Sequence, residues 1–266
     1  MAHLFKGIKR VIMGSSTVIA VTGKGGTGKT VLATIMIGML AKRYPGQILA
    51  IEADSASSLP YTLGVTVEKT VSEFRKELSG SRQLQASLND TPSKEIMRSL
   101  LTPCEGFDLL TMGRPEGAGC FCAVNDLLKL GITILAEDYL VAIIDGEAGP
   151  EQLNRRVVES VDVLLVMADM SRRSIATAAE IMKVAQGGEN PEIAIKKAGL
   201  VLNRVKSDVP ERALLKNTGL DVLAELPEDA LVNTFDREGK SLMELPEDSP
   251  CPVVIKALLE KIIPGL

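Results

Sequence analysis

The octapeptide GKGGTGKT at residues 23–30 combines the residue types that bind a chain of phosphates. Its glycines leave successive backbone N–H groups free to wrap around a phosphate at the start of a helix. In such a loop Lys29 reaches the β- and γ-phosphates, and the hydroxyl of Thr30 binds Mg²⁺. The backbone donors are expected from Gly25, Gly26, Thr27 and Gly28. The octapeptide therefore predicts a nucleotide site that works with Mg²⁺.

Three acidic residues have the positions that phosphate hydrolysis requires. Hydrolysis needs a metal, an oriented water and charge neutralisation, with little covalent work for the protein. Asp145 ends an apolar segment (VAIID) and is the expected support for Mg²⁺, while Asp54 at the end of QILAIEAD is placed to orient the attacking water. Glu147 could sense the γ-phosphate and move when it leaves. The alternative for each is a solvated loop carboxylate, which is weak for Asp145 and Asp54 and stronger for Glu147.

The phosphate loop must be positioned by a strand before it and a helix after it, and the sequence predicts both. An apolar run at 17–22 precedes the loop and a helix at 29–44 follows it. Further strands are predicted at 47–54, 107–112, 139–145, 161–169, 198–205 and 221–226. Further helices are predicted at 171–186, from about Pro210, and at 251–263. Continuous Val, Ile and Leu runs between helices indicate a doubly wound, mostly parallel sheet with helices on both faces, in which ligands lie at the carboxyl ends of the strands.

Two segments differ from this α/β pattern. Residues 1–16 are expected to be a leader or flexible arm, which leaves 17–266 as a single ATPase domain. Residues 65–101 are polar, with apolar residues at helical spacing and an interruption at 89–93, so they predict a helical insert of two helices beside the sheet. This insert is either a solvated crossover or a surface for a client protein.

Composition excludes several classes of protein. A net charge of −4, a pI of about 5.3 and the absence of Trp disfavour nucleic acid as a partner. The longest apolar stretch, residues 31–41, is too short to span a bilayer, and the last helix has only two lysines, so no stable membrane insertion is expected. The first twelve residues lack the features of a secretory signal, which predicts a cytoplasmic protein.

A pair of cysteines lies in the segment GRPEGAGCFCAVN at residues 113–125. Cys120 and Cys122 are one residue apart on glycine-rich backbone and can point at one thiophilic ion. A closed tetrahedral site needs four thiolates, so two protomers that meet at this segment would complete it. The alternative is two small apolar residues in a turn. Cys104 and Cys251 are assigned no role, and a single histidine, His3, excludes an imidazole-rich metal store.

Lys24 is not part of the minimal phosphate-loop pattern, and with its glycine neighbours it can point away from its own nucleotide. It resembles the signature lysine of the MinD and nitrogenase-iron-protein class of deviant P-loop ATPases, and in that class the lysine crosses a dimer interface to the partner's phosphates. Together with GRPEGxGCxC and the loop DGEAGPEQLNRR, the chain from residue 17 onward resembles the CooC-type ATPases, accessory proteins that help insert nickel into carbon monoxide dehydrogenase, and the related acetyl-CoA synthase maturation factor. The alternative for Lys24 is a solvated loop lysine.

This resemblance implies ATP as the nucleotide, catalytic roles for Lys24, Lys29 and Asp54, and nickel or zinc at a four-thiolate site shared between protomers. Recognition of adenine is implied for Asn203 and for the turn Pro227-Glu228-Asp229, and Arg204 is implied to bind the nucleotide. Two departures stand out: the family often has Asp-x-Asp-Pro where this chain has Glu52-Ala53-Asp54-Ser55, and often a histidine where Gln152 stands. The first leaves open how Glu52 and Asp54 divide their labour.

Three functions follow from these residues. The first is an ATP-hydrolysing, homodimeric metallochaperone whose client is carbon monoxide dehydrogenase or acetyl-CoA synthase. The second is a dimeric reductase or carrier with an iron–sulfur cluster between two chains, which would be coloured. The third is a positioning ATPase that binds membrane or nucleoid, which the acidic pI and the weakly basic last helix disfavour.

Overall fold

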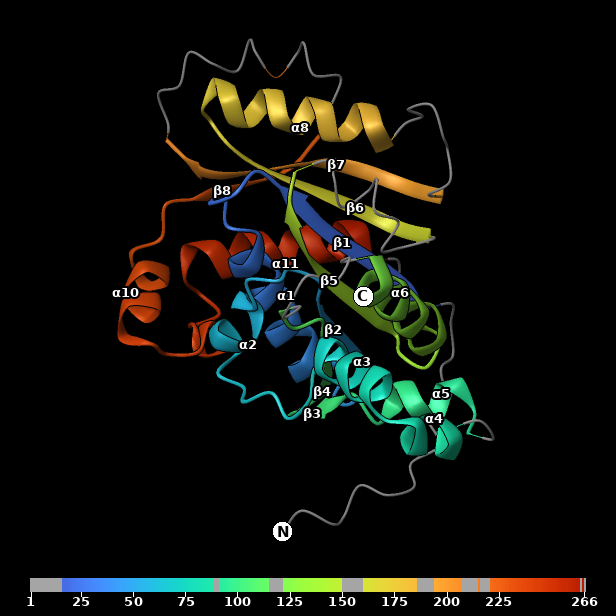
Figure 1. The fold of residues 1–266 in the computed structure, drawn as a ribbon. Helices are drawn as coiled ribbons and strands as arrows, with labels where there is room; N and C mark the ends of the chain where they lie inside the picture. The colour runs from blue at the N-terminus through green and yellow to red at the C-terminus, as the bar shows by residue number, and fades with distance from the viewer. Residues whose placement is uncertain are drawn as a thin grey trace.

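The computed structural model describes residues 16–88, 91–114, 122–149, 160–185, 194–206, 215, 221–263 and 265. Its strands form one eight-stranded sheet in the order β3-β4-β2-β5-β1-β6-β7-β8 (Figure 1), in which every pairing is parallel except that of β3 with β4. The strands are β1 (Thr17–Gly23), β2 (Ile48–Glu52), β3 (Thr102–Pro103), β4 (Phe107–Thr111), β5 (Val141–Ala148), β6 (Ser160–Asp169), β7 (Ala194–Val205) and β8 (Val222–Pro227).

Helices cover both faces of this sheet. The helical elements are α1 (Lys29–Arg43), α2 (Ser58–Leu63), α3 (Val71–Gly80), α4 (Arg82–Leu88), α5 (Ser93–Arg98), α6 (Cys122–Ala136), α8 (Arg172–Ala185), α10 (Ala230–Glu238), the short 3₁₀ turn η1 (Leu242–Glu244) and α11 (Pro250–Ile262). One face packs against α1, α2 and α11, and the opposite face against α3, α5, α6 and α8. The predicted doubly wound α/β fold is confirmed.

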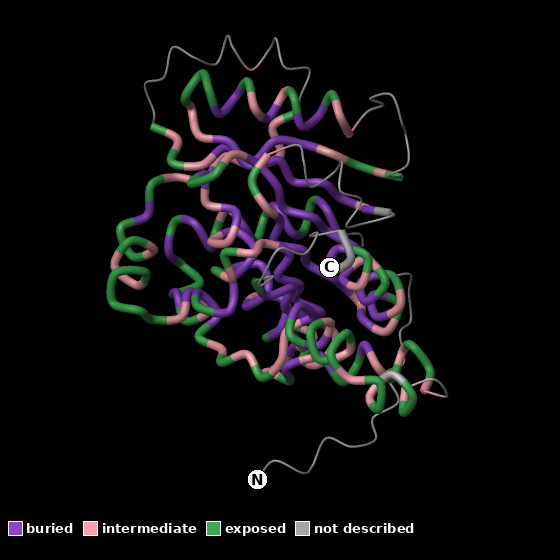
Figure 2. The backbone as a smooth tube through the Cα atoms, in the orientation of Figure 1, coloured by how far each residue is buried: buried purple, intermediate pink, exposed green. Residues whose placement is uncertain are grey.

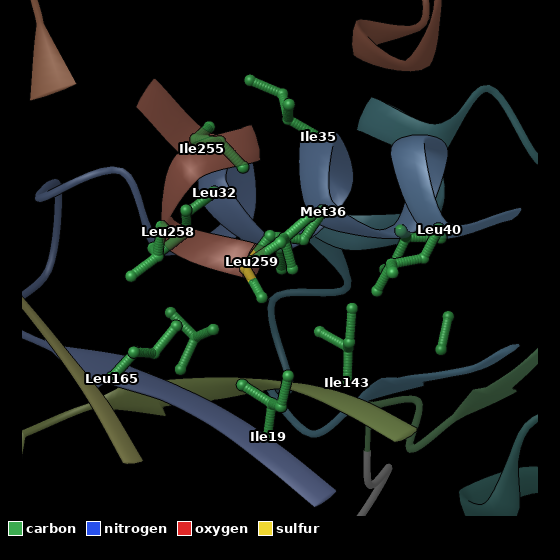
Figure 3. Packing of buried hydrophobic residues seen from close by; sticks show 14 of the residues in the cluster. Ile19, Leu32, Ile35, Met36, Leu40, Ile143, Leu165, Ile255, Leu258 and Leu259 are labelled. Atoms are coloured by element: carbon green, nitrogen blue, oxygen red, sulfur yellow. The ribbon is translucent and has the colours of Figure 1, made fainter. Parts of the chain in front are cut away.

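A hydrophobic core lies on each face of the sheet, and this explains why the central strands have continuous apolar sequences. Alternate residues of each strand belong to opposite faces, and all five residues of β2 are buried. Figure 2 shows the buried residues concentrated along the sheet and the inner sides of the helices. On one face, helices α1 and α11 lie over β1, β5 and β6 (Figure 3). The helices contribute Leu32, Met36, Leu258 and Leu259, and the strands contribute Ile19, Ile143 and Leu165.

The insert differs from its prediction. It contains three short helices, α3, α4 and α5, where two were expected, because Gly80 ends α3 and Ser81 starts a new helix by accepting a hydrogen bond from the backbone N–H of Leu84 at 3.2 Å. Helices α2, α6 and α10 and the edge strand β3 were not predicted at all. The predicted helix from about Pro210 falls mostly outside the described residues.

The strands' carboxyl ends meet at one edge of the sheet, and this geometry brings the candidate residues together. Val21 is the register partner of Asp145 across β1 and β5, and Glu52 is the partner of Asp145 across β2 and β5. Asp169 at the end of β6 pairs with Asn203 on β7. None of the helices in the described part of the chain has the length and hydropathy that crossing a bilayer would require.

Candidate nucleotide site

The phosphate loop opens α1 without any side-chain cap. Gly28 is the N-cap residue, with a left-handed φ of 93°, and no side chain accepts from the first turn of the helix. The first backbone N–H groups of a helix have no intrahelical partner and attract an anion. At the other end of the loop, a Cβ on Gly23 would lie 2.3 Å from the carbonyl oxygen of Met167, so only glycine fits there. The loop therefore has the geometry of a phosphate site.

Hydrogen bonds from outside and inside the loop hold its carbonyl groups. The Thr27 hydroxyl donates to the Lys24 carbonyl at 2.7 Å. Two adjacent residues at the end of β7 reach the loop as well: Asn203 Nδ2 donates to the Thr27 carbonyl at 2.8 Å, and Arg204 Nη2 donates to the Gly26 carbonyl at 2.6 Å. The conformation of the loop is thus fixed before any nucleotide binds.

Asp145 lies beneath this loop as a buried carboxylate. It is 1% exposed, and neither of its carboxylate oxygens has a hydrogen-bond partner of normal geometry among the described residues. Burial raises its pKa, while the nearby Thr30 hydroxyl and the Lys29 ammonium oppose that rise, and the resulting pKa is about 6. A buried carboxylate without partners is costly in isolation, so the site is suited to a cation.

The residues at this point fit Mg²⁺, which prefers oxygen ligands and keeps several of its waters. Thr30 and Asp145 would hold the ion, Thr30 directly and Asp145 directly or through a water. The unpaired oxygens of Asp145 are the acceptors that such a hydrated ion would satisfy. When bound, Mg²⁺ would neutralise charge on the phosphates.

Glu52 and Asp54 differ in burial and in hydrogen bonding, and this difference indicates which of them has which role. Glu52 is fully buried and accepts backbone N–H groups from Asp54 at 3.1 Å and Leu59 at 2.6 Å. Burial, followed by the neighbouring Asp145, raises the pKa of Glu52 to about 8. Asp54 is only partly buried, and one of its oxygens accepts from the backbone of Ala56 at 2.8 Å. Glu52 thus supports the loop after β2, and Asp54 is the carboxylate that water can reach.

Glu147 links two loops at the same edge. β5 continues past Asp145 to Ala148, and the Gly149 N–H donates to the Gly23 carbonyl at 3.1 Å. The Ser55 hydroxyl donates to Glu147 Oε1 at 3.3 Å, which joins the end of β5 to the segment after β2. A movement of the backbone at the end of β5 would therefore shift both the phosphate loop and the segment that contains Asp54.

Lys24 is partly buried at the edge of the loop. It lies near Asp169, a residue that was not singled out from the sequence. Burial alone would raise the pKa of Asp169, but hydrogen bonds from Ser171 and the charges of Lys24 and Arg204 lower it. In the sequence Asp169 closes an apolar run as Asp54 and Asp145 do, so the pattern that selected those two would also have found Asp169.

The residues predicted to recognise adenine meet at the ends of β7 and β8. Val205 is the register partner of Pro227, which brings Asn203 and Arg204 near the turn after β8. Asp229 is 6% exposed and connects two helix starts, because its oxygens accept from the N–H groups of Leu231, at the start of α10, and Cys251, at the start of α11. The contact of these residues with adenine remains a prediction.

Cys120 lies outside the described residues, and Cys122 is the first residue of α6. Within the part of the chain that the structure describes, no group of three or more His, Cys, Asp or Glu could hold a metal. Burial raises the pKa of the Cys104 thiol to about 12 and that of Cys251 to about 11. Both thiols are free, and with such raised pKa values they are protonated at neutral pH.

The fold and this site define a class of protein, the α/β nucleotide-binding proteins with a phosphate loop between β1 and α1. Residues 18–242 match the model of the CobQ/CobB/MinD/ParA nucleotide-binding domain, and the chain belongs to this family. It is an ATP-binding protein of the MinD/ParA type.

Individual relatives refine the comparison. The chain is 39% identical to the uncharacterized ATP-binding protein MJ0685 of Methanocaldococcus jannaschii, over 92% of this chain and 98% of that protein. It is 28% identical to the carbon monoxide dehydrogenase accessory protein CooC of Rhodospirillum rubrum, over 92% and 97%. Among solved structures, a ParA family ATPase from Chlorobium tepidum matches with a TM-score of 0.70 and 19% identity, over 93% and 99%. MinD of Pyrococcus horikoshii, complexed with Mg-ADP, matches with a TM-score of 0.66 and 20% identity, over 92% and 95%.

Proposed function

We propose that the chain is an ATP-hydrolysing metallochaperone that works as a homodimer and helps insert nickel into carbon monoxide dehydrogenase or a related nickel enzyme. Support comes from the similarity to the accessory protein CooC over nearly the full length of both chains. The observation that carries the metal-binding part of the proposal is the sequence pair Cys120 and Cys122, of which Cys122 is the first residue of α6.

The hydrolytic half rests on residues at the carboxyl ends of β1, β2 and β5. Lys29 is buried beside Asp145 and neutralises charge on the phosphates, while the uncapped start of α1 binds them. Asp54 orients the attacking water, since Glu52 is held by backbone N–H groups. Glu147 senses the γ-phosphate through its position between the two loops.

The dimer follows from two features that need a second chain. Lys24 crosses to the partner's phosphates, and the two cysteines of each chain supply half of a tetrahedral site for a thiophilic ion. ATP and the ion favour the closed dimer, the client docks, and hydrolysis loosens the thiolate site so that the ion leaves. Because zinc also suits four thiolates, binding in isolation does not identify the physiological ion.

A metal titration followed by size-exclusion chromatography tests this function. It uses the native chain and Cys120→Ser/Cys122→Ser, each with and without a non-hydrolysable ATP analogue. The expected result is one zinc or nickel ion per two chains, lost in the double variant. The matched control is Cys104→Ser, which removes a thiol with a raised pKa and should leave binding unchanged.

Two results would contradict the proposal. Metal binding that persists in the double variant would show that other residues hold the ion. A brown protein with visible absorption would instead favour the iron–sulfur alternative.

A further inference from the structure

Arg204 has an unusual backbone conformation next to the phosphate loop. Its φ is +55°, and within the described residues only one other non-glycine residue, Ser57, has a positive φ. A left-handed backbone conformation is unfavourable for any residue with a Cβ, because the Cβ crowds the backbone. Such conformations persist where the surrounding structure requires them, and they often mark functional sites.

The side chain of Arg204 shows what that conformation achieves. Its Nη2 donates to the Gly26 carbonyl at 2.6 Å, a contact between residues 178 positions apart. Its own backbone N–H donates to Asn203 Oδ1 at 2.9 Å, while Asn203 Nδ2 holds the Thr27 carbonyl. Two consecutive carbonyls of the loop are therefore held from the end of β7.

Because the peptide bond is planar, the hydrogen bonds to these carbonyls also fix the directions of the neighbouring N–H groups. In a trans peptide the carbonyl and the following N–H point in opposite directions. With the Gly26 and Thr27 carbonyls held toward β7, the N–H groups of Thr27 and Gly28 must point away from β7. The Thr27 N–H donates within the loop, to the Lys24 carbonyl at 3.3 Å. The left-handed φ of Gly28 and its N-cap position place the Gly28 N–H at the start of α1.

We propose that Arg204 is a positioning residue: from the end of β7 it holds the phosphate loop in its binding conformation through the Gly26 carbonyl. This differs from the direct contact with the nucleotide that the sequence analysis expected of Arg204. The effect of its charge on the pKa of Asp169 agrees with a guanidinium that lies over the ends of β6 and β7 and beside the loop. The proposal depends on nucleotide binding and not on the metal half of the proposed function, so the two can fail separately.

The test compares Mg-ATP with inorganic tripolyphosphate, which has phosphates but no base. In Arg204→Ala, affinity for both ligands should fall by about tenfold, as expected for the loss of one charge-assisted hydrogen bond. Arg204→Lys should recover part of that loss. Arg204→Gly should bind as weakly as Arg204→Ala yet melt at no lower temperature without ligand, because glycine accepts the positive φ. The charge control is Lys196→Ala, at the opposite end of β7, where Lys196 is exposed and pairs with Asp162.

The outcomes separate the two roles of Arg204. A loss of ATP affinity with unchanged tripolyphosphate affinity would show that Arg204 contacts the base, which would overturn the proposal and leave the nucleotide site intact. Unchanged affinity for both ligands would also overturn it. So would a lower melting temperature for Arg204→Gly than for Arg204→Ala.

Discussion

Among single residues, Lys24 decides whether hydrolysis needs a second chain. It lies partly buried at the rim of the loop, near Asp169, while Lys29 lies buried beside Asp145. Lys24→Ala should lower turnover by about 1,000-fold, the scale of a charge supplied in trans to phosphoryl transfer. ATP affinity should change little, because Lys29 and the backbone of the loop remain. Steady-state hydrolysis and equilibrium binding measure the two quantities separately.

Lys29→Ala is the matched comparison, since it removes a lysine from the same loop and should weaken ATP binding itself. Equal losses of affinity in both variants would contradict the distinct role of Lys24.

The roles of Asp54 and Glu52 can also be distinguished by measuring turnover and ATP affinity separately. Asp54→Asn keeps the backbone contacts of the segment but removes the carboxylate that reaches water, so kcat should fall by about 100-fold or more with ATP affinity retained. Glu52→Gln disturbs a buried acceptor of two N–H groups and should lower the melting temperature more than Asp54→Asn does. The reverse pattern, with kcat lost mainly in Glu52→Gln, would show that the first carboxylate activates the water.

The sequence predicted the position of the phosphate loop between β1 and α1 and of Asp145 on β5, because their spacing is local and fixed. The roles of these residues toward nucleotide stay predictions. The sequence could not predict that Glu52 is buried and bonded to the backbone of Leu59, or that Arg204 reaches Gly26. These contacts join residues from separate elements, and only the fold brings them together. The surroundings of Cys120 remain a prediction.

Among the helices and strands, the insert is joined to the sheet through Asp138. This residue follows α6 and pairs with two residues of α5: Lys94 at 2.6 Å and Arg98 at 2.7 Å. Burial would raise the pKa of Asp138, but the hydrogen bonds and charges of these two residues lower it below the ordinary value of 3.8. Asp138→Asn should therefore destabilise the protein at neutral pH, and thermal melting measures the difference.

The sign of the pH dependence follows from that lowered pKa. The carboxylate stabilises the fold above the pKa of the unfolded chain, and this contribution is lost as pH falls through the folded-state pKa. The gap in melting temperature between native chain and Asp138→Asn should be constant above about pH 5 and close below about pH 4. A gap that stays constant down to about pH 3 would contradict the ion pair.

The strands with a continuous apolar run were predicted well, since burial dictates that pattern. Helix α6 was missed although Val124, Leu128 and Ile132 give it an apolar face on the core. Helix α10 was missed although Val232 and Phe235 pack against the core, because none of its residues is fully buried and its apolar face is short.

Strand β3 has only two residues, one of them proline, and lies at the sheet edge. So short an edge strand has no apolar pattern by which the sequence could predict it. In the insert, the helical spacing was correct, but the break at Gly80 and Ser81 was overlooked.

For the molecule as a whole, the proposed function requires two chains to share one ion. The fold supplies a complete phosphate loop, a support for Mg²⁺ and a helix that starts at Cys122, all within one chain. What one chain lacks is a second pair of thiolates, because Cys104 and Cys251 lie elsewhere and have raised pKa values. The proposed function therefore requires that two chains share one metal site.

Native mass spectrometry of mixed dimers examines this sharing without relying on the client enzyme. Native chains are mixed with Cys120→Ser/Cys122→Ser chains in the presence of a non-hydrolysable ATP analogue and zinc. Native dimers should hold one ion, whereas mixed dimers, which only the ATP analogue favours, should form less readily and hold none. Mixed dimers that retain an ion, or native monomers that hold one each, would show that the site is not shared.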